Sequence, residues 1–202
     1  MKFVFLHGLG QTAHDWQSVI HQSSLSDADC PELFSFAEND FTYSGILSGL
    51  ERFYANASEP FVLCGLSLGA LLALDYTIRH PEQISSLILV GAQYKVPTRL
   101  IDFQNLIFRC MPENAFTDMG LSKHDTIKLS HSMRMLDFSP KLSELHCPVS
   151  VICGKKDRAN LKAAKQLHAL LPQSHLHIIP GAGHEVNKDA PKALAALIEN
   201  CI

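Results

Sequence analysis

The most informative segment of this chain is Phe61-Val62-Leu63-Cys64-Gly65-Leu66-Ser67-Leu68-Gly69. Its apolar start runs into Gly-x-Ser-x-Gly, and a run of strong helix formers, residues 70–76, follows at once. A serine on so sharp a turn from strand to helix sits in strained backbone, and side chains at positions 65 and 69 would crowd the neighbouring helix and strand. The pattern therefore predicts a nucleophile elbow, from which Ser67 projects alone into a cleft.

A carboxylate and a histidine follow Ser67 in the chain order that such a serine site requires. The apolar run 148–153 ends in a loop that carries Asp157, and the run 175–179 ends in a glycine-rich loop that carries His184. In an open parallel sheet, the loops after the carboxyl ends of the strands converge on one crevice. We therefore expect Ser67, Asp157 and His184 to meet there.

The first apolar run, residues 3–6, leads into a fourth motif, His7-Gly8-Leu9-Gly10, whose loop can turn a backbone N–H inward. With these four motifs the chain resembles the α/β-hydrolase superfamily, specifically its small serine-nucleophile members. The motifs extend from Phe3 to His184 and so cover nearly the whole chain. The resemblance implies an α/β fold with a doubly wound, mostly parallel sheet, trimmed of the two leading strands of larger members.

The resemblance also implies a role for each matching residue. Ser67 would be the nucleophile, His184 the general base and then the general acid, and Asp157 the residue that orients the imidazole. The backbone N–H groups of Leu9 and Leu68 would form the oxyanion hole. No cofactor is implied, and a serine at the elbow argues against the haloalkane dehalogenases and epoxide hydrolases of this fold, which use an aspartate there.

Other side chains compete for these roles. Asp102 and Asp137 offer carboxylates in or near the middle of the chain, but neither follows a strand end as directly as Asp157 does. Cys64 is an alternative nucleophile, although a thiol inside a strand usually just packs. His7 is more often a hydrogen bonder that shapes its loop than a catalyst.

Alternating strand and helix patterns surround the motifs, and residues 94–145 interrupt them. Helical patterns at 98–110 and 123–136 predict a small helical cap inserted into a single domain of residues 1–202. Its apolar side chains exceed what one packed face needs, so we expect some to line a pocket, Phe103 among them. His14 and Trp16 are further candidates for substrate contact. Outside the cap we expect helices at 14–22, 44–57, 160–171 and 191–200, and strands at 3–6, 32–36, 84–91, 149–153 and 176–179.

Composition limits the classes of function. With 202 residues, 47% of them hydrophobic, the chain suits one globular domain. A formal net charge of −3 without a Lys/Arg run argues against a nucleic-acid surface. Six dispersed cysteines without C-x-x-C pairs, and the lack of a secretory or membrane-spanning stretch, favour a cytoplasmic location. His175 and His177 lack the further ligands that a metal site needs.

The expected partner is therefore a small-molecule acyl substrate. An apolar cap with few charges favours an uncharged carboxylic ester of modest size. Thioesters, amides and C–C bonds use the same three residues, and the sequence does not separate them. A non-catalytic ligand-binding relative and a protein with vestigial motifs stay open as other classes.

Overall fold

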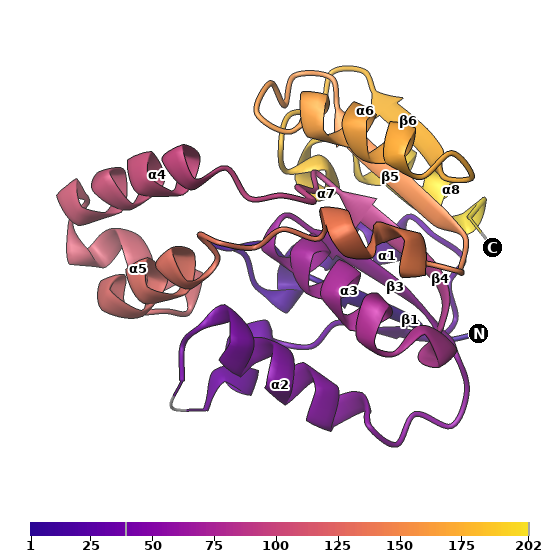
Figure 1. The fold of residues 1–202 in the computed structure, drawn as a ribbon, viewed down its shortest axis with the longest axis horizontal. Helices are drawn as coiled ribbons and strands as arrows, with labels where there is room; N and C mark the ends of the chain where they lie inside the picture. The colour runs from indigo at the N-terminus through magenta and orange to yellow at the C-terminus, as the bar shows by residue number, and fades with distance from the viewer. Residues whose placement is uncertain (39, 202) are drawn as a thin grey trace.

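The computed structural model describes residues 1–38 and 40–201, and a parallel sheet forms its centre (Figure 1). Among these residues six strands pair in the order β2-β1-β3-β4-β5-β6, and every pair is parallel. The strands are β1 (Phe3–Leu6), β2 (Ala28–Asp29), β3 (Phe61–Leu66), β4 (Ile84–Val90), β5 (Val149–Gly154) and β6 (His175–Ile179). The expected α/β fold with a doubly wound sheet is confirmed, and the sheet is parallel throughout.

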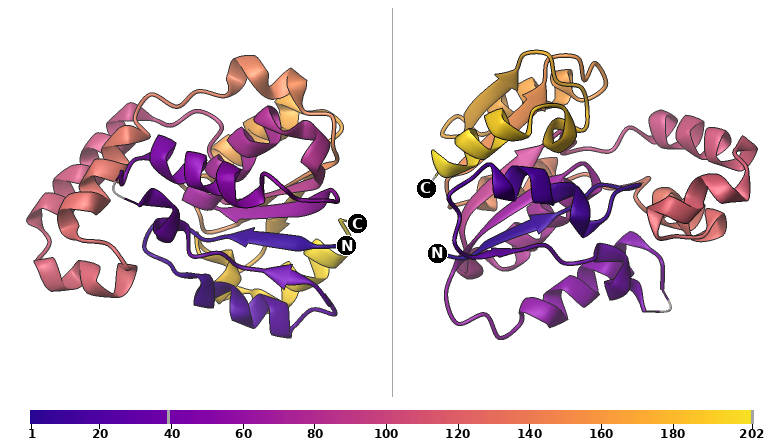
Figure 2. Two further views of the ribbon diagram at one scale, coloured as in Figure 1. Left: turned by 90° about the horizontal axis from the view of Figure 1, so that it is seen from below. Right: turned by 180° about the vertical axis from the view of Figure 1, so that it is seen from behind.

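Helices cover both faces of the sheet, as the continuous apolar strands require. The first face packs against α2 (Tyr43–Tyr54), α3 (Leu68–Arg79) and α6 (Leu161–Leu170). The second packs against α1 (Gln17–His21), α7 (Val186–Asp189) and α8 (Pro191–Glu199), which the view from behind shows (Figure 2). Strands β3 and β5 are buried along their whole length between the two layers.

A helical insertion separates β4 from β5. It contains α4 (Thr98–Cys110), the 3₁₀ segment η4 (Glu113–Met119) and α5 (Lys123–Ser132), and it lies at the opposite end of the molecule from both termini (Figure 2). The two chain segments that join it to the sheet are bonded together, since Phe138 N–H donates to Tyr94 O at 2.8 Å and Val96 N–H donates to Leu136 O at 2.9 Å.

The remaining elements are short 3₁₀ segments: η1 (Ala13–Trp16), η2 (Leu33–Ala37), η3 (Pro81–Gln83) and η5 (Ser139–Glu144). Within the described ranges, no helix combines the length and the apolar character needed to cross a membrane.

Three sequence predictions of secondary structure were wrong in detail. Residues 32–36 do not form a strand, because Leu33, Phe34 and Ala37 are buried at helical spacing in η2, and the edge strand β2 lies earlier in the chain. The first predicted helix, 14–22, is divided between η1 and α1. The second cap helix, predicted to reach 136, ends at Ser132.

Candidate active site

Ser67 occupies the turn between β3 and α3 in a strained backbone conformation. Its φ of 56° and ψ of −111° lie in a region that residues other than glycine rarely adopt. The turn is held from both sides: Ser67 N–H donates to Val90 O at 3.0 Å, and Ser67 O accepts from the N–H groups of Ala70 and Leu71. The side chain therefore leaves the sheet at its carboxyl edge, as an elbow serine should.

The two glycines of the motif are needed for close approach of backbone to backbone. A Cβ added at Gly65 would lie 2.2 Å from Gly69 O, and one added at Gly69 would lie 2.2 Å from Leu6 O. Neither obstacle is a flexible side chain. The crowding of neighbouring helix and strand that the sequence predicted is therefore present at both positions.

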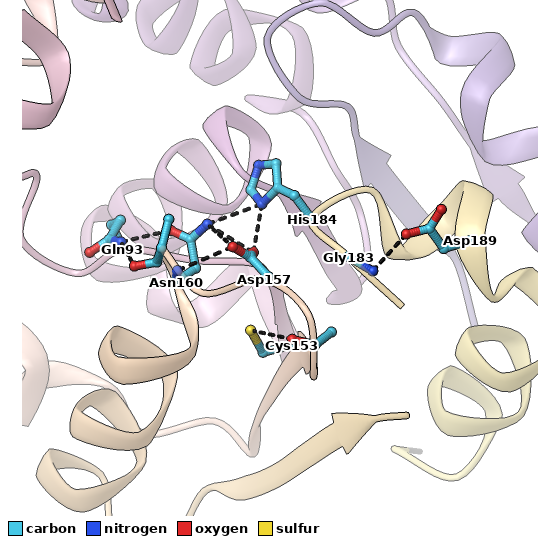
Figure 3. A network of polar contacts seen from close by, with 9 residues as sticks. Gln93, Cys153, Asp157, Asn160, Gly183, His184 and Asp189 are labelled. Atoms are coloured by element: carbon cyan, nitrogen blue, oxygen red, sulfur yellow. Dashed lines mark hydrogen bonds and ion pairs between the residues drawn. The ribbon is translucent and has the colours of Figure 1, made fainter. Parts of the chain in front are cut away.

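Asp157 and His184 meet across the loops that follow β5 and β6 (Figure 3). His184 Nδ1 lies 2.7 Å from Asp157 Oδ2, and the bond uses Nδ1–H as donor, so Nε2 is unprotonated in the neutral ring. The loops lie side by side because Lys155 N–H donates to Ile179 O and Lys156 N–H donates to Ala182 O.

The environment of Asp157 favours its ionised form. The carboxyl group is buried, and burial alone would raise its pKa. Hydrogen bonds from His184 and Asn160 outweigh that cost, and the pKa of Asp157 lies below its ordinary value. A buried carboxylate bonded to the imidazole can hold the ring in one tautomer and stabilise an imidazolium.

The His7-Gly8-Leu9-Gly10 loop is shaped by its own histidine. His7 is fully buried, its Nδ1–H donates to Gly8 O at 3.0 Å, and its Nε2 accepts from Leu33 N–H at 3.1 Å. Burial lowers the pKa of His7 despite Glu32 nearby, and only a neutral ring can accept the Leu33 proton. His7 is therefore a structural hydrogen bonder.

Two backbone amides beside Ser67 are free to bind an anion. Among the described residues, neither Leu9 N–H nor Leu68 N–H has a hydrogen-bond partner. Leu68 is the first residue of α3, whose leading amides have no acceptor within the helix. Both residues line the same cavity as Ser67.

The cavity has a volume of about 310 Å³ and collects the predicted triad beneath the cap. Within the described part of the chain, its lining includes no Lys, Arg or Glu. The lining consists of Leu9, Ser67, Leu68, Leu71, Gly91, Gln93, Val96, Pro97, Leu100, Ile101, Gln104, Met133, Asp157, Ala159, Asn160 and His184. Ser67 Oγ makes no hydrogen bond to another described residue.

The three predicted substrate contacts lie outside this lining. Trp16 is fully buried on the other face of the sheet, where its ring packs 5.1 Å from that of Phe5, so it is a core residue. His14 is exposed on η1. Phe103 is exposed on α4, because Leu100, Ile101 and Gln104 occupy the side of that helix that lines the cavity.

The competing groups are occupied elsewhere. Asp102 pairs with Arg134 at 2.9 Å, and Asp137 pairs with Lys95 at 2.7 Å. Cys64 is buried within β3, and burial raises the pKa of its thiol well above the ordinary value, so it is unsuited to act as a thiolate.

Sequence reasoning missed two polar residues of the site, Asn160 and Gln93. Asn160 precedes α6, so it reads as an ordinary helix cap, but it makes no capping bond and turns its amide to Asp157 instead. Gln93 follows β4 in a segment without a motif. Its proximity to Asn160 depends on the fold, so no sequence signal pointed to it.

Comparison with known proteins identifies the family. The model of the alpha/beta hydrolase family matches residues 3–197, and the chain belongs to this family. A Bacillus subtilis protein, provisionally named 2-succinyl-6-hydroxy-2,4-cyclohexadiene-1-carboxylate synthase, is 22% identical over 96% of this chain and 88% of its own length. A provisionally assigned carbamate hydrolase of Escherichia coli, RutD, is 25% identical over 70% of this chain, and the match spans 65% of that protein.

The fold is shared with solved hydrolases at low sequence identity. An esterase of Exiguobacterium antarcticum superposes with a TM-score of 0.81 at 18% identity, over all of this chain and 91% of the esterase. This similarity shows the fold alone, and together with the family match it makes the protein an α/β-fold hydrolase.

Proposed function

We propose that the protein is a serine hydrolase that cleaves a small, uncharged carboxylic ester through an acyl-enzyme on Ser67. One observation supports this above all: the strained Ser67, the His184–Asp157 pair and the free amides of Leu9 and Leu68 border a single apolar cavity. Nucleophile, base, orienting acid and anion donors are the parts that acyl transfer requires.

The reaction would proceed in two halves. His184 Nε2 accepts the Ser67 proton as Oγ attacks the carbonyl carbon, and the resulting oxyanion is held between the amides of Leu9 and Leu68. The imidazolium, stabilised by Asp157, protonates the departing alcohol. Water then attacks the acyl-enzyme with His184 again as base, which releases the acid and regenerates Ser67. These steps need no cofactor.

The cavity lining argues for an uncharged acyl group. Apart from Asp157 and His184 its side chains carry no formal charge at neutral pH, and most are aliphatic. A substrate carboxylate placed there would lose its hydration without gaining a cationic partner, which is costly. For that reason we do not transfer the carboxylate-bearing reaction in the name of the Bacillus relative. The partner would be a small molecule rather than a nucleic acid or membrane.

The test is intact mass after incubation with a fluorophosphonate, on wild type and Ser67→Ala, alongside p-nitrophenyl esters of increasing chain length. We expect one adduct and ester turnover, both lost in Ser67→Ala. An adduct without ester turnover would reject the ester and redirect the search to thioesters, amides and C–C bonds. The absence of an adduct would reject an activated Ser67 and favour a ligand-binding relative.

A further inference from the structure

Asn160 contacts both oxygens of the Asp157 carboxylate and lies beside the imidazole. Its side-chain Nδ2 lies 3.0 Å from Oδ1 and 2.8 Å from Oδ2 of Asp157, and its backbone N–H donates to Oδ1 at 3.2 Å. The same Nδ2 lies 3.0 Å from His184 Nδ1 (Figure 3). Asn160 is itself buried, so these contacts face little competition from water.

Gln93 determines which end of the Asn160 amide faces Asp157. Gln93 Nε2 donates to Asn160 Oδ1 at 2.6 Å and lies 3.4 Å from Ala159 O. A carboxylate accepts hydrogen bonds and does not donate them, so the Asn160 oxygen has no partner on the Asp157 side. Both neighbours therefore favour the orientation in which the NH₂ group points to Asp157.

We propose that Asn160, oriented by Gln93, is a positioning residue that fixes the Asp157 carboxylate so that Oδ2 receives the Nδ1–H of His184. This inference rests on the proposed serine-hydrolase function. Asp157 follows a strand end on a loop, and without the Asn160 side chain only the His184 bond and the backbone N–H of residue 160 would hold its carboxylate. A carboxylate held by fewer donors would leave the imidazole less often in the productive orientation.

The contacts have a consequence for proton transfer. The donors from Asn160 disperse the negative charge of Asp157, and their partially positive hydrogens also lie beside the His184 ring. Both effects oppose protonation of the imidazole. Loss of the Asn160 side chain should therefore shift the acid limb of the reaction toward higher pH, in addition to slowing it.

Few other groups could produce such a shift. Cys153 lies close enough to influence Asp157, but the pKa of its thiol is raised to about 12 by burial, so it stays neutral. Asp189 bonds Gly183 N–H and Glu185 bonds Gln11 and Lys188, and carboxyl groups ordinarily titrate at lower pH than an imidazole. The other titratable or charged side chains on the segments that carry the pair are Cys153, Lys155, Lys156, Arg158, Glu185, Lys188 and Asp189.

The test measures the second-order rate of fluorophosphonate labelling against pH, which needs no knowledge of the substrate. For Asn160→Ala we expect a loss of about 10- to 100-fold, since misplacement by about 1 Å costs about 100-fold, and an acid limb displaced to higher pH. Asn200→Ala, a substitution of an exposed asparagine after α8, is the control and should match wild type. Thermal unfolding verifies that each variant is folded.

A second variant keeps the test informative if Asn160→Ala does not fold. Gln93→Met removes the donor to Asn160 Oδ1 and adds no charge near His184, so the Asn160 amide loses the contact that orients it. We expect it to reproduce the loss of rate and the direction of the shift. Folded variants whose acid limb stays in place would overturn the positioning role, even if their rate fell. No labelling of wild type would instead refute the proposed function.

Discussion

Gly91 lies directly under the His184–Asp157 pair, and its replacement by alanine tests the geometry of the site. A Cβ at this position would stand 3.1 Å from His184 Nδ1 and 3.2 Å from Cε1, whereas ordinary contacts begin at 3.4 Å. The ring would have to retreat by about 0.3 Å, the difference between 3.4 and 3.1. If about 1 Å of misplacement costs about 100-fold, this retreat costs about fourfold in kcat/KM.

The backbone adds a second effect, on stability alone. Gly91 has a φ of +57°, and a side chain in left-handed backbone costs about 1–2 kcal/mol. Gly181→Ala is a matched control, because Gly181 has a φ of +83° with nothing within 4 Å of the added Cβ. We expect urea unfolding to show similar destabilisation in both variants. Ester hydrolysis should fall only in Gly91→Ala.

Ester hydrolysis that falls in parallel with stability in both variants would contradict the predicted contact between the added methyl group of Gly91→Ala and His184. Wild-type activity in Gly91→Ala would mean that the imidazole adapts to the added methyl group without cost. A loss in Gly181→Ala as large as that in Gly91→Ala would mean that backbone strain, and not contact with His184, controls the site.

Three further predictions concern single side chains. The Ser67→Gly variant should be about 1 kcal/mol more stable in urea unfolding than the Ser67→Ala variant, because glycine adopts a φ of 56° without strain. Equal stability of the two variants would show that the backbone at Ser67 is not strained. The free energy of unfolding should fall as the pH drops below 6.5, because His7 takes up a proton when unfolded, whereas burial lowers the pKa of its ring in the folded protein. His7→Gln should reduce this dependence of stability on pH, and an unchanged dependence would exclude His7 as its source. Met133→Ala should improve kcat/KM for longer p-nitrophenyl esters by about fourfold per added methylene, at about 0.8 kcal/mol each, because Met133 lines the cavity. Met135→Ala, 83% exposed, is its control and should leave the chain-length preference unchanged.

The strands were predictable where burial on both faces leaves a continuous apolar run. Residues 61–66, 84–90 and 149–154 are of this kind. The segment 33–37 was not, because a short apolar run does not reveal whether it is extended or helical. Its helical turn depends partly on a distant acceptor, His7 Nε2, for Leu33 N–H.

The residues that line the cavity were harder to predict than the grouping of Ser67, Asp157 and His184, because they depend on which face of an element meets the cavity. Trp16 is close to the Leu9 loop in sequence, but η1 places it on the opposite face of the sheet, beside Phe5. Phe103 lies on the cap helix that borders the cavity, but its side chain is exposed, whereas Leu100, Ile101 and Gln104 of the same helix line the cavity. The spacing of apolar residues in the sequence shows which of them share a face of a helix, but not whether that face points to the cavity, to the core or to solvent.

The grouping of Ser67, Asp157 and His184 at one cavity was predictable, because hydrogen bonds of the sheet continue past the ends of the strands. Ser67 N–H bonds Val90 O, Gly91 N–H bonds Ile152 O, and Lys155 N–H bonds Ile179 O, each about one residue beyond its strand. These bonds continue the parallel ladder from β3 through β6, so the loops that carry Ser67, Asp157 and His184 start from fixed relative positions. The cap enters and leaves between β4 and β5 without interrupting that ladder. Changes in the cap should therefore alter which acyl groups fit while leaving the reactivity of Ser67 toward a small fluorophosphonate intact.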